Sequence, residues 1–305
     1  MRISTSLFYD RASTAMASLT RQADALQTAI ATGKKLAAPS SDAIAYRQLS
    51  GLSRAATDAT QDGANVTLAS ALLTASDTAL GQIETQLQRA SELAVRAGNG
   101  TLNQTERTAF AQELDAIVED LVRLANSTDS RGGPLFSGSS EAVPYAIQPD
   151  GSVAYSGTGE ASAIPIGTGA SIHATTSGEQ VFDGIPVKAG GTSDMFAIVR
   201  GLADRLRGGG GGGDAAADLK SALTSISDAR ASIGARGARL ELETARLASA
   251  AETREVTRSG LEDTDIAEIM GQAQGDPIRI CDRLIDRSLA RGGEDNVTVI
   301  VVTPP

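Results

Sequence analysis

Aromatic side chains are scarce in this chain of 305 residues: Phe, Tyr and Trp together make up 3% of it, and Trp is absent. Aromatic residues bury more surface than other side chains and dominate the interiors of compact proteins. The composition therefore disfavours a large globular core. Long helices that pack through Ala, Leu and Ile need few aromatic residues, and the sequence supplies those three types freely.

Cysteine and histidine occur once each. The single Cys281 excludes an internal disulfide framework. The single His173 has no sequence neighbours that resemble metal ligands or triad partners, which favours a surface or turn histidine. We therefore expect no catalytic residues, no cofactor and no metal site.

Neither a basic stripe nor a long apolar run is present. The net charge is −10 and the isoelectric point is about 4.7, whereas binding to a polyanion requires clustered Lys and Arg. No segment approaches the roughly 18 consecutive apolar residues of a membrane span, and no apolar run follows the basic start. We expect no nucleic-acid partner, no cleaved signal peptide and no membrane insertion.

Helical seams are what the chain does contain. The first predicted helix ends near Gly33. A second helix is predicted to begin at Ala43, after Pro39 and the capping candidate Asp42. A capping box formed by Asn103 with the glutamate three residues later predicts the start of a third helix. Apolar residues spaced three, four or seven apart predict helices that need partner helices. The predicted packing seam comprises Leu19, Leu26, Ile30, Leu73, Leu80, Leu87, Leu114, Ile117, Leu121, Ile226, Ile233, Leu240 and Leu247.

The pattern changes between residues 131 and 191. Val143, Tyr145 and Ile147 alternate before Pro149-Asp150-Gly151, and Val153 and Tyr155 alternate after it, which predicts a β-hairpin. Ile164, Ile166 and Ile172 indicate further short strands. A helix is predicted over 195–207, and the six glycines of 208–213 are interpreted as a flexible link.

These patterns predict a mainly α protein with a β insertion: an elongated helical rod in which long antiparallel helices come from both termini, with a small β-rich domain in the middle. The predicted divisions are an N-terminal assembly helix (1–40), the N-terminal rod (41–130), a β-rich outer domain with a short helix (131–207), the glycine link (208–213), the C-terminal rod (214–270) and a tail (271–305).

Several segments resemble the flagellin family in order and spacing. They are MRISTSLFYDRA, ATGKKLAAPSSDAIAYRQL, RASELAVRAGNGTLNQTERTAFAQELDAIVEDLVRLANS, GGPLFSGS, and, late in the chain, SISDARASIGARGARLELETARLASAAE with LEDTDIAEIM. Together they cover about residues 1–270, with the β-rich part matching more weakly. The resemblance implies a non-enzymatic subunit that is exported by the flagellar type III system, with a chaperone, to the extracellular part of the bacterial flagellum.

Within that family, GGPLFSGS followed by one short β-rich domain is more similar to the hook-associated junction proteins of type 3 than to filament flagellins. This implies lateral assembly with identical copies in a ring, and contact with another hook-associated protein and with flagellin. A short filament flagellin is the alternative, since it would have the same helices.

The family resemblance ends after Met270. Residues 271–305 resemble the C-terminal end of the phosphatase 2C family, in which the position of Asp295 is a metal ligand. The other carboxylates of such a site are missing from the chain, and one hard cation needs about six oxygen ligands. We therefore interpret the tail as a fusion or frameshift product, with an inactive phosphatase-like fusion as the second alternative.

Overall fold

The computed structural model describes residues 3–32, 34, 42–98 and 102–262. The chain divides into two compact units. We name residues 1–56 with 251–305 the terminal unit, and residues 57–250 the central unit. Cys281, Asp295 and the whole of the predicted tail lie outside the described residues.

The terminal unit contains α1 (Ile3–Thr32), the start of α2 (Ala43–Gly98) and the end of α6 (Ala215–Glu262). Asp42 caps α2, because its Oδ1 accepts hydrogen bonds from the backbone N–H groups of Ile44 (2.9 Å) and Ala45 (3.0 Å). These groups lack partners within the helix. The predicted start at Ala43 is confirmed, and so is the end of α1 beside Gly33.

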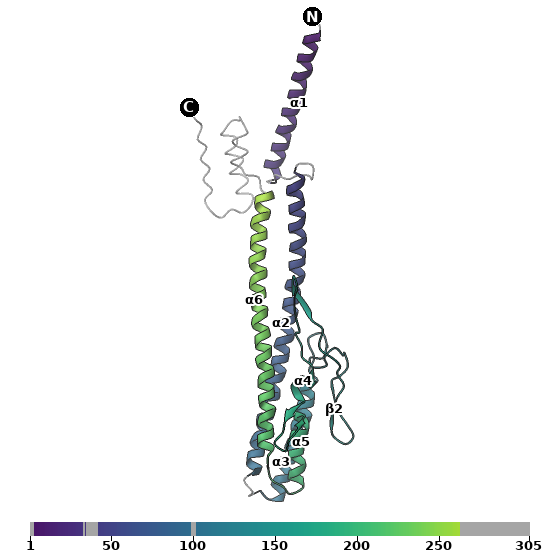
Figure 1. The fold of residues 1–305 in the computed structure, drawn as a ribbon, viewed down its shortest axis with the longest axis vertical. Coiled ribbons are helices and arrows are strands. Elements are labelled where there is room, and N and C mark those ends of the chain that lie inside the picture. The colour runs from purple at the N-terminus through teal and green to yellow at the C-terminus, as the bar shows by residue number, and fades with distance from the viewer. Residues whose placement is uncertain (1–2, 33, 35–41, 99–101, 263–305) are drawn as a thin grey trace, which may run out of the picture. The chain divides into compact units, whose positions relative to one another are not determined.

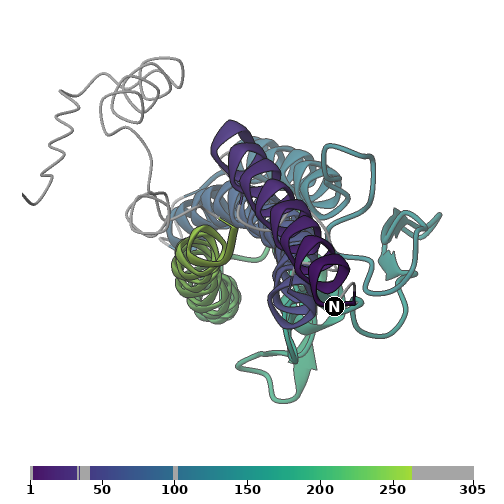
Figure 2. The same cartoon turned by 90° about the horizontal axis from the view of Figure 1, so that it is seen from above.

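The central unit is a bundle of α2, α3 (Gln104–Ala125), α5 (Met195–Arg207) and α6, which run side by side in Figures 1 and 2. The predicted capping box begins α3: the N–H of Glu106 donates to Asn103 Oδ1 (2.9 Å), and the N–H of Asn103 donates to Glu106 Oε2 (2.8 Å). One continuous core of buried Leu, Ile, Val and Ala residues joins the four helices.

The packing of α5 could not be read from the sequence. The predicted divisions group 195–207 with the β-rich domain, and in the structure the closest helix neighbour of α3 is α5. Because α5 buries one whole apolar face, it needs a partner wider than a two-stranded sheet. The buried residues of α5 are Met195, Phe196, Ile198, Val199, Leu202, Ala203 and Leu206.

Three two-stranded antiparallel sheets occupy the predicted β-rich segment within the described residues. The predicted hairpin is confirmed, with β1 (Tyr145–Ile147) paired to β2 (Val153–Tyr155). The other sheets pair β3 (Ile164–Gly167) with β4 (Ala170–Ile172) and β5 (Ile185–Pro186) with β6 (Thr192–Ser193). The short helix α4 (Gly178–Phe182) lies between the last two sheets in the chain.

Five of the few aromatic residues gather where this segment meets α5. The ring of Tyr145 lies 5.1 Å from Tyr155, 5.8 Å from Phe182 and 5.1 Å from Phe196, and Phe136 lies 5.1 Å from Phe182. Aromatic pairs at such distances add about 0.5–1.5 kcal/mol beyond surface burial. The β-rich segment therefore shares the hydrophobic core of the bundle.

The glycine run between α5 and α6 makes a close backbone approach. A Cβ on Gly212 would lie 2.3 Å from the carbonyl oxygen of Ala94 in α2, and Gly209 and Gly213 have φ angles of 81° and 52°. Side chains are strained at such angles and would clash at such a distance. The run that we interpreted as a flexible link is thus also shaped to pack against α2.

Candidate functional site: an apolar helix surface

The described residues hold no group of three or more His, Cys, Asp and Glu side chains that could bind a metal ion. His173 has a local structural role: its Nδ1 lies 2.7 Å from the carbonyl oxygen of Ala161, and its own carbonyl accepts a hydrogen bond from Arg236 (2.8 Å). Among the helices described, none is long and apolar enough to cross a membrane.

Large apolar side chains are exposed along α1. Phe8 is 69% exposed and Leu19 is 62% exposed, and Leu7, Tyr9 and Met16 are exposed as well. Burying one side chain of this size is worth about 1.5–3 kcal/mol. We name these five exposed side chains the α1 apolar surface. Leu7, Phe8 and Tyr9 are consecutive and therefore point to different sides of the helix, and the exposure of several large apolar groups on one helix is typical of an interaction site.

The predicted packing seam divides between the two units. Leu19 is exposed on α1, and the side chains of Leu26 and Ile30 lie outside the description. Leu247 is partly buried against the core. The remaining seam residues are all buried in the core of the central unit: Leu73, Leu80, Leu87, Leu114, Ile117, Leu121, Ile226, Ile233 and Leu240.

Sequence reasoning missed Phe8 and Tyr9. The ring centroids of these two residues lie 6.2 Å apart in an edge-to-face arrangement, and both residues are exposed. Neither residue fits the spacing of the seam, so the periodic pattern of apolar residues did not include them. A usable signal was their rarity, because two adjacent aromatic residues stand out in a chain that has nine in all.

Ion pairs hold α6 to α2 within the central unit. Arg230 of α6 donates to Asp77 (2.9 Å) and Glu84 (2.7 Å), which lie about two turns apart on α2. Hydrogen bonds to these carboxylates raise the pKa of Arg230 above its usual value. Exposed pairs contribute little energy each, but two carboxylates on one guanidinium set the relative position of the two helices.

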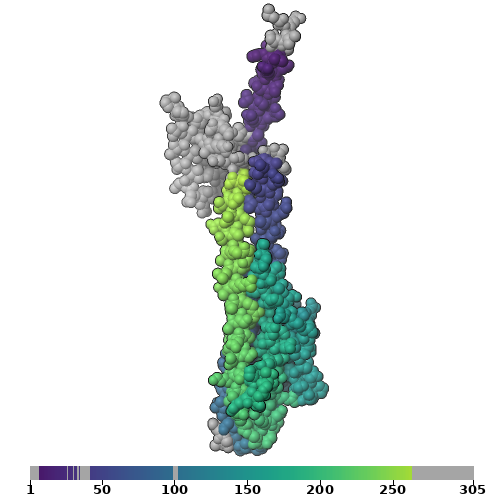
Figure 3. Space-filling view, in the orientation of Figure 1, coloured from purple at the N-terminus to yellow at the C-terminus, as the bar shows by residue number. Residues whose placement is uncertain are grey.

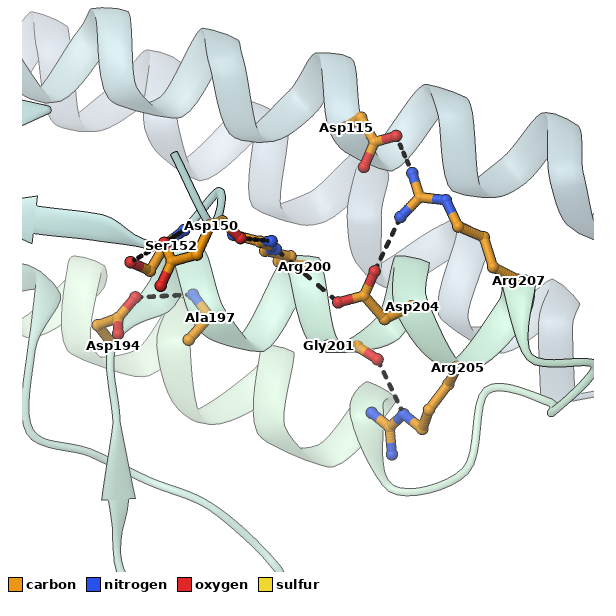
Figure 4. Close-up of polar contacts among 10 residues, drawn as sticks. All are labelled: Asp115, Asp150, Ser152, Asp194, Ala197, Arg200, Gly201, Asp204, Arg205 and Arg207. Atoms are coloured by element: carbon orange, nitrogen blue, oxygen red, sulfur yellow. Dashed lines mark hydrogen bonds and ion pairs between the residues drawn. The ribbon is translucent and has the colours of Figure 1, made fainter. Parts of the chain in front are cut away.

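A second set of polar contacts surrounds α5 (Figure 4). Arg207 bridges Asp115 of α3 and Asp204 of its own helix, and Arg200 donates to the backbone carbonyl of Asp150 in the β1–β2 turn. Asp194 caps α5 by accepting from the N–H of Ala197 (2.7 Å). These contacts attach α5 to α3 on one side and to the hairpin on the other.

The apolar seam of the central unit is thus mostly buried, whereas the apolar residues of α1 named above are exposed. Comparison with known proteins relates this arrangement to flagellar components. Residues 3–141 match the family model of the bacterial flagellin N-terminal helical region. Flagellar hook-associated protein 3 of Salmonella typhimurium is 36% identical over 146 residues, which are 48% of this chain and 46% of the relative. The chain therefore spans about half the length of the curated relatives it matches.

Solved structures show the same fold. The crystal structure of FlgL from Xanthomonas campestris has a TM-score of 0.62 at 21% identity, over 68% of this chain and 99% of the other. The flagellar junction protein FlgL from Legionella pneumophila has a TM-score of 0.61 at 15% identity, over 71% of this chain and all of the other. The mainly α fold with a β insertion is confirmed, while the resemblance of residues 271–305 to phosphatase 2C stays without support. Residues 3–141 are therefore similar to the N-terminal helical region of bacterial flagellins, and the described part of the chain has a fold like that of FlgL.

Proposed function

We propose that this chain is a structural subunit of the bacterial flagellum, located at the junction between hook and filament, and that it acts by helix packing without catalysis. The observation that carries the proposal is the α1 apolar surface on a protein whose central seam is already buried. The printed names of its relative and of the Legionella structure, a hook-associated protein and a junction protein, support this location.

The α1 apolar surface is then the part that joins subunits. Its partners are identical copies in a ring, and the neighbouring hook-associated protein and flagellin. Because isolated helices are marginally stable in water, a helix with few contacts of its own also suits passage through the type III export machinery with a chaperone. Under this proposal 1–40 form the assembly segment, and the β-rich segment of 131–207 lies toward the outside.

Localisation in cells that lack their own junction protein tests this function. Immunogold labelling of the expressed chain is expected in a short band between hook and filament. Labelling along whole filaments would favour the alternative, a filament flagellin. Absence of label from flagella would contradict both.

Matched variants test the role of α1. Replacing Phe8 and Met16 together by Asp is expected to abolish the band, because charged groups cannot be buried in an apolar interface without a partner. The control Leu242→Asp alters an exposed residue of α6 and should leave the band unchanged. A manganese-dependent assay of phosphoester hydrolysis on the whole chain is expected to show no activity.

A further inference from the structure

A cavity of about 350 Å³ lies within the central unit between α2, α6 and the segment around α4. Figure 3 shows the surface of α6 uncovered beside the β-rich segment on one face of this unit. The apolar lining residues are Leu80, Phe136, Val181, Ala229 and Ile233. The polar lining residues that bear on ligand binding are Ser76, Thr176, Asp228 and Arg236.

Arg236 brings a positive charge to this cavity without a carboxylate partner among the described residues. Its Nη1 donates to the carbonyl oxygen of His173 (2.8 Å) and its Nη2 donates to Thr176 Oγ1 (2.9 Å), both of which are neutral acceptors. Burial lowers the pKa of Arg236 below its usual value. Arg230, two turns earlier on the same helix, has two carboxylate partners instead.

Ser76 adds an unsatisfied hydroxyl. The residue is 2% exposed, and its Oγ has no hydrogen-bond partner within the described part of the chain. Leaving such a buried group unpaired costs about 1–3 kcal/mol. A guanidinium that faces only neutral acceptors and a buried hydroxyl therefore both line a cavity that apolar side chains also line.

The negative charge of Asp228 restricts which anions the cavity can bind. Asp228 is exposed and lines the same cavity, so its carboxylate repels multiply charged anions such as phosphate. A planar carboxylate matches the paired N–H groups of a guanidinium. A short aliphatic stem would contact Leu80, Phe136 and Ile233.

We propose that the Arg236 cavity binds a singly charged carboxylate on a short aliphatic stem. Two sources carry this chemistry: a small free carboxylate, and the Asp or Glu side chain of another copy of this chain, which has 37 such residues. The proposal does not depend on the flagellar assignment.

Propionate tests the cavity on the whole chain. Its addition is expected to shift the methyl NMR signals of Leu80, Val181 and Ile233 with a saturable, roughly millimolar dissociation constant. Propionamide, which has the same shape and no charge, should not shift these signals. Arg236→Gln is expected to weaken propionate binding at least about tenfold, since a charge-assisted hydrogen bond is lost. The control Arg239→Gln, an exposed residue of α6, should bind as before.

Sedimentation distinguishes the two sources. If the ligand is an acidic side chain of another copy, Arg236→Gln weakens self-association of the chain and Arg239→Gln does not, even where propionate fails to saturate. Equal responses to propionate and propionamide would overturn the proposal, and so would the absence of both propionate binding and an Arg236-dependent self-association. The comparison of the two ligands uses the unaltered chain, so it stands even if a variant fails to fold.

Discussion

Leu121 contributes to the stability of the protein through the burial of its side chain. Its side chain is 0% exposed within the core of the central unit, where α3 meets its neighbours. Leu121→Ala is expected to lower the free energy of unfolding by about 2–5 kcal/mol, from lost transfer energy and the cavity left behind. Urea denaturation measures this change. The control Leu242→Ala, at a position that is 74% exposed, should change stability by less than about 0.5 kcal/mol.

Asp183 makes stability depend on pH. Burial, and then the charges of Asp194 and Glu179, raise its pKa from 3.8 to about 6. The folded state therefore holds this proton more tightly than the unfolded state does. The resulting stabilisation is complete below about pH 3.8 and is lost as the pH rises through about 6.

Asp183→Asn removes the charge that the folded state disfavours. We expect it to raise the free energy of unfolding at pH 8 by about 1–2 kcal/mol, discounted because the group is only half buried, and to give no such gain near pH 4. Denaturant unfolding at the two pH values checks this. Asp58→Asn, at an exposed position of α2, serves as the control. Equal effects of Asp183→Asn at both pH values would contradict the assignment.

At the scale of an element, the start of α3 rests on two reciprocal hydrogen bonds. Asn103→Ala removes the side-chain acceptor for the N–H of Glu106 and is expected to cost about 1 kcal/mol. Asn103→Ser keeps an acceptor and should cost less. Gln112→Ala, at an exposed position in the middle of α3, is the control for helix propensity. Thermal melts that rank Ala and Ser equally at position 103 would argue against the capping role.

The elements also differ in how completely they are packed. The apolar faces of α3 and α5 are buried against each other, and the aromatic cluster connects them to the hairpin. Helix α1 keeps five large apolar side chains exposed. Within the described residues the buried apolar core therefore lies in the central unit, and the exposed apolar side chains of α1 are the ones that we propose take part in assembly.

At the scale of the whole molecule, deletion of residues 2–30 should separate folding from export. The core residues that the structure describes all lie outside that segment, so the denaturation midpoint of the central unit is expected to change little. Secretion is expected to stop, because we propose that the deleted segment carries the signal recognised by the type III export machinery. Western blots of the medium and cell pellets, compared with Leu242→Ala, measure the effect. Undiminished secretion would contradict the proposed role of this segment in export.

Most elements followed from local chemistry in the sequence. Asp42 and Asn103 mark the starts of α2 and α3 because a helix terminus has unpaired N–H groups that such side chains satisfy. The turn at Asp150-Gly151 separates two alternating runs and so predicted the hairpin. These signals act within a few residues, which is why they are readable without a structure.

Sequence patterns were enough to identify α1, α2, α3, α5 and α6, the hairpin, the flagellin resemblance and the residues whose spacing makes a seam, but not the five-residue helix α4. Which partner each face meets could be seen only in the folded chain: α5 packs on α3, most of the seam is buried, and Leu19 is exposed. It also brought Ser76 and Arg236, 160 positions apart in the chain, to one cavity. Periodicity states that a face is apolar, whereas the choice among competing partners depends on the total area that each packing buries.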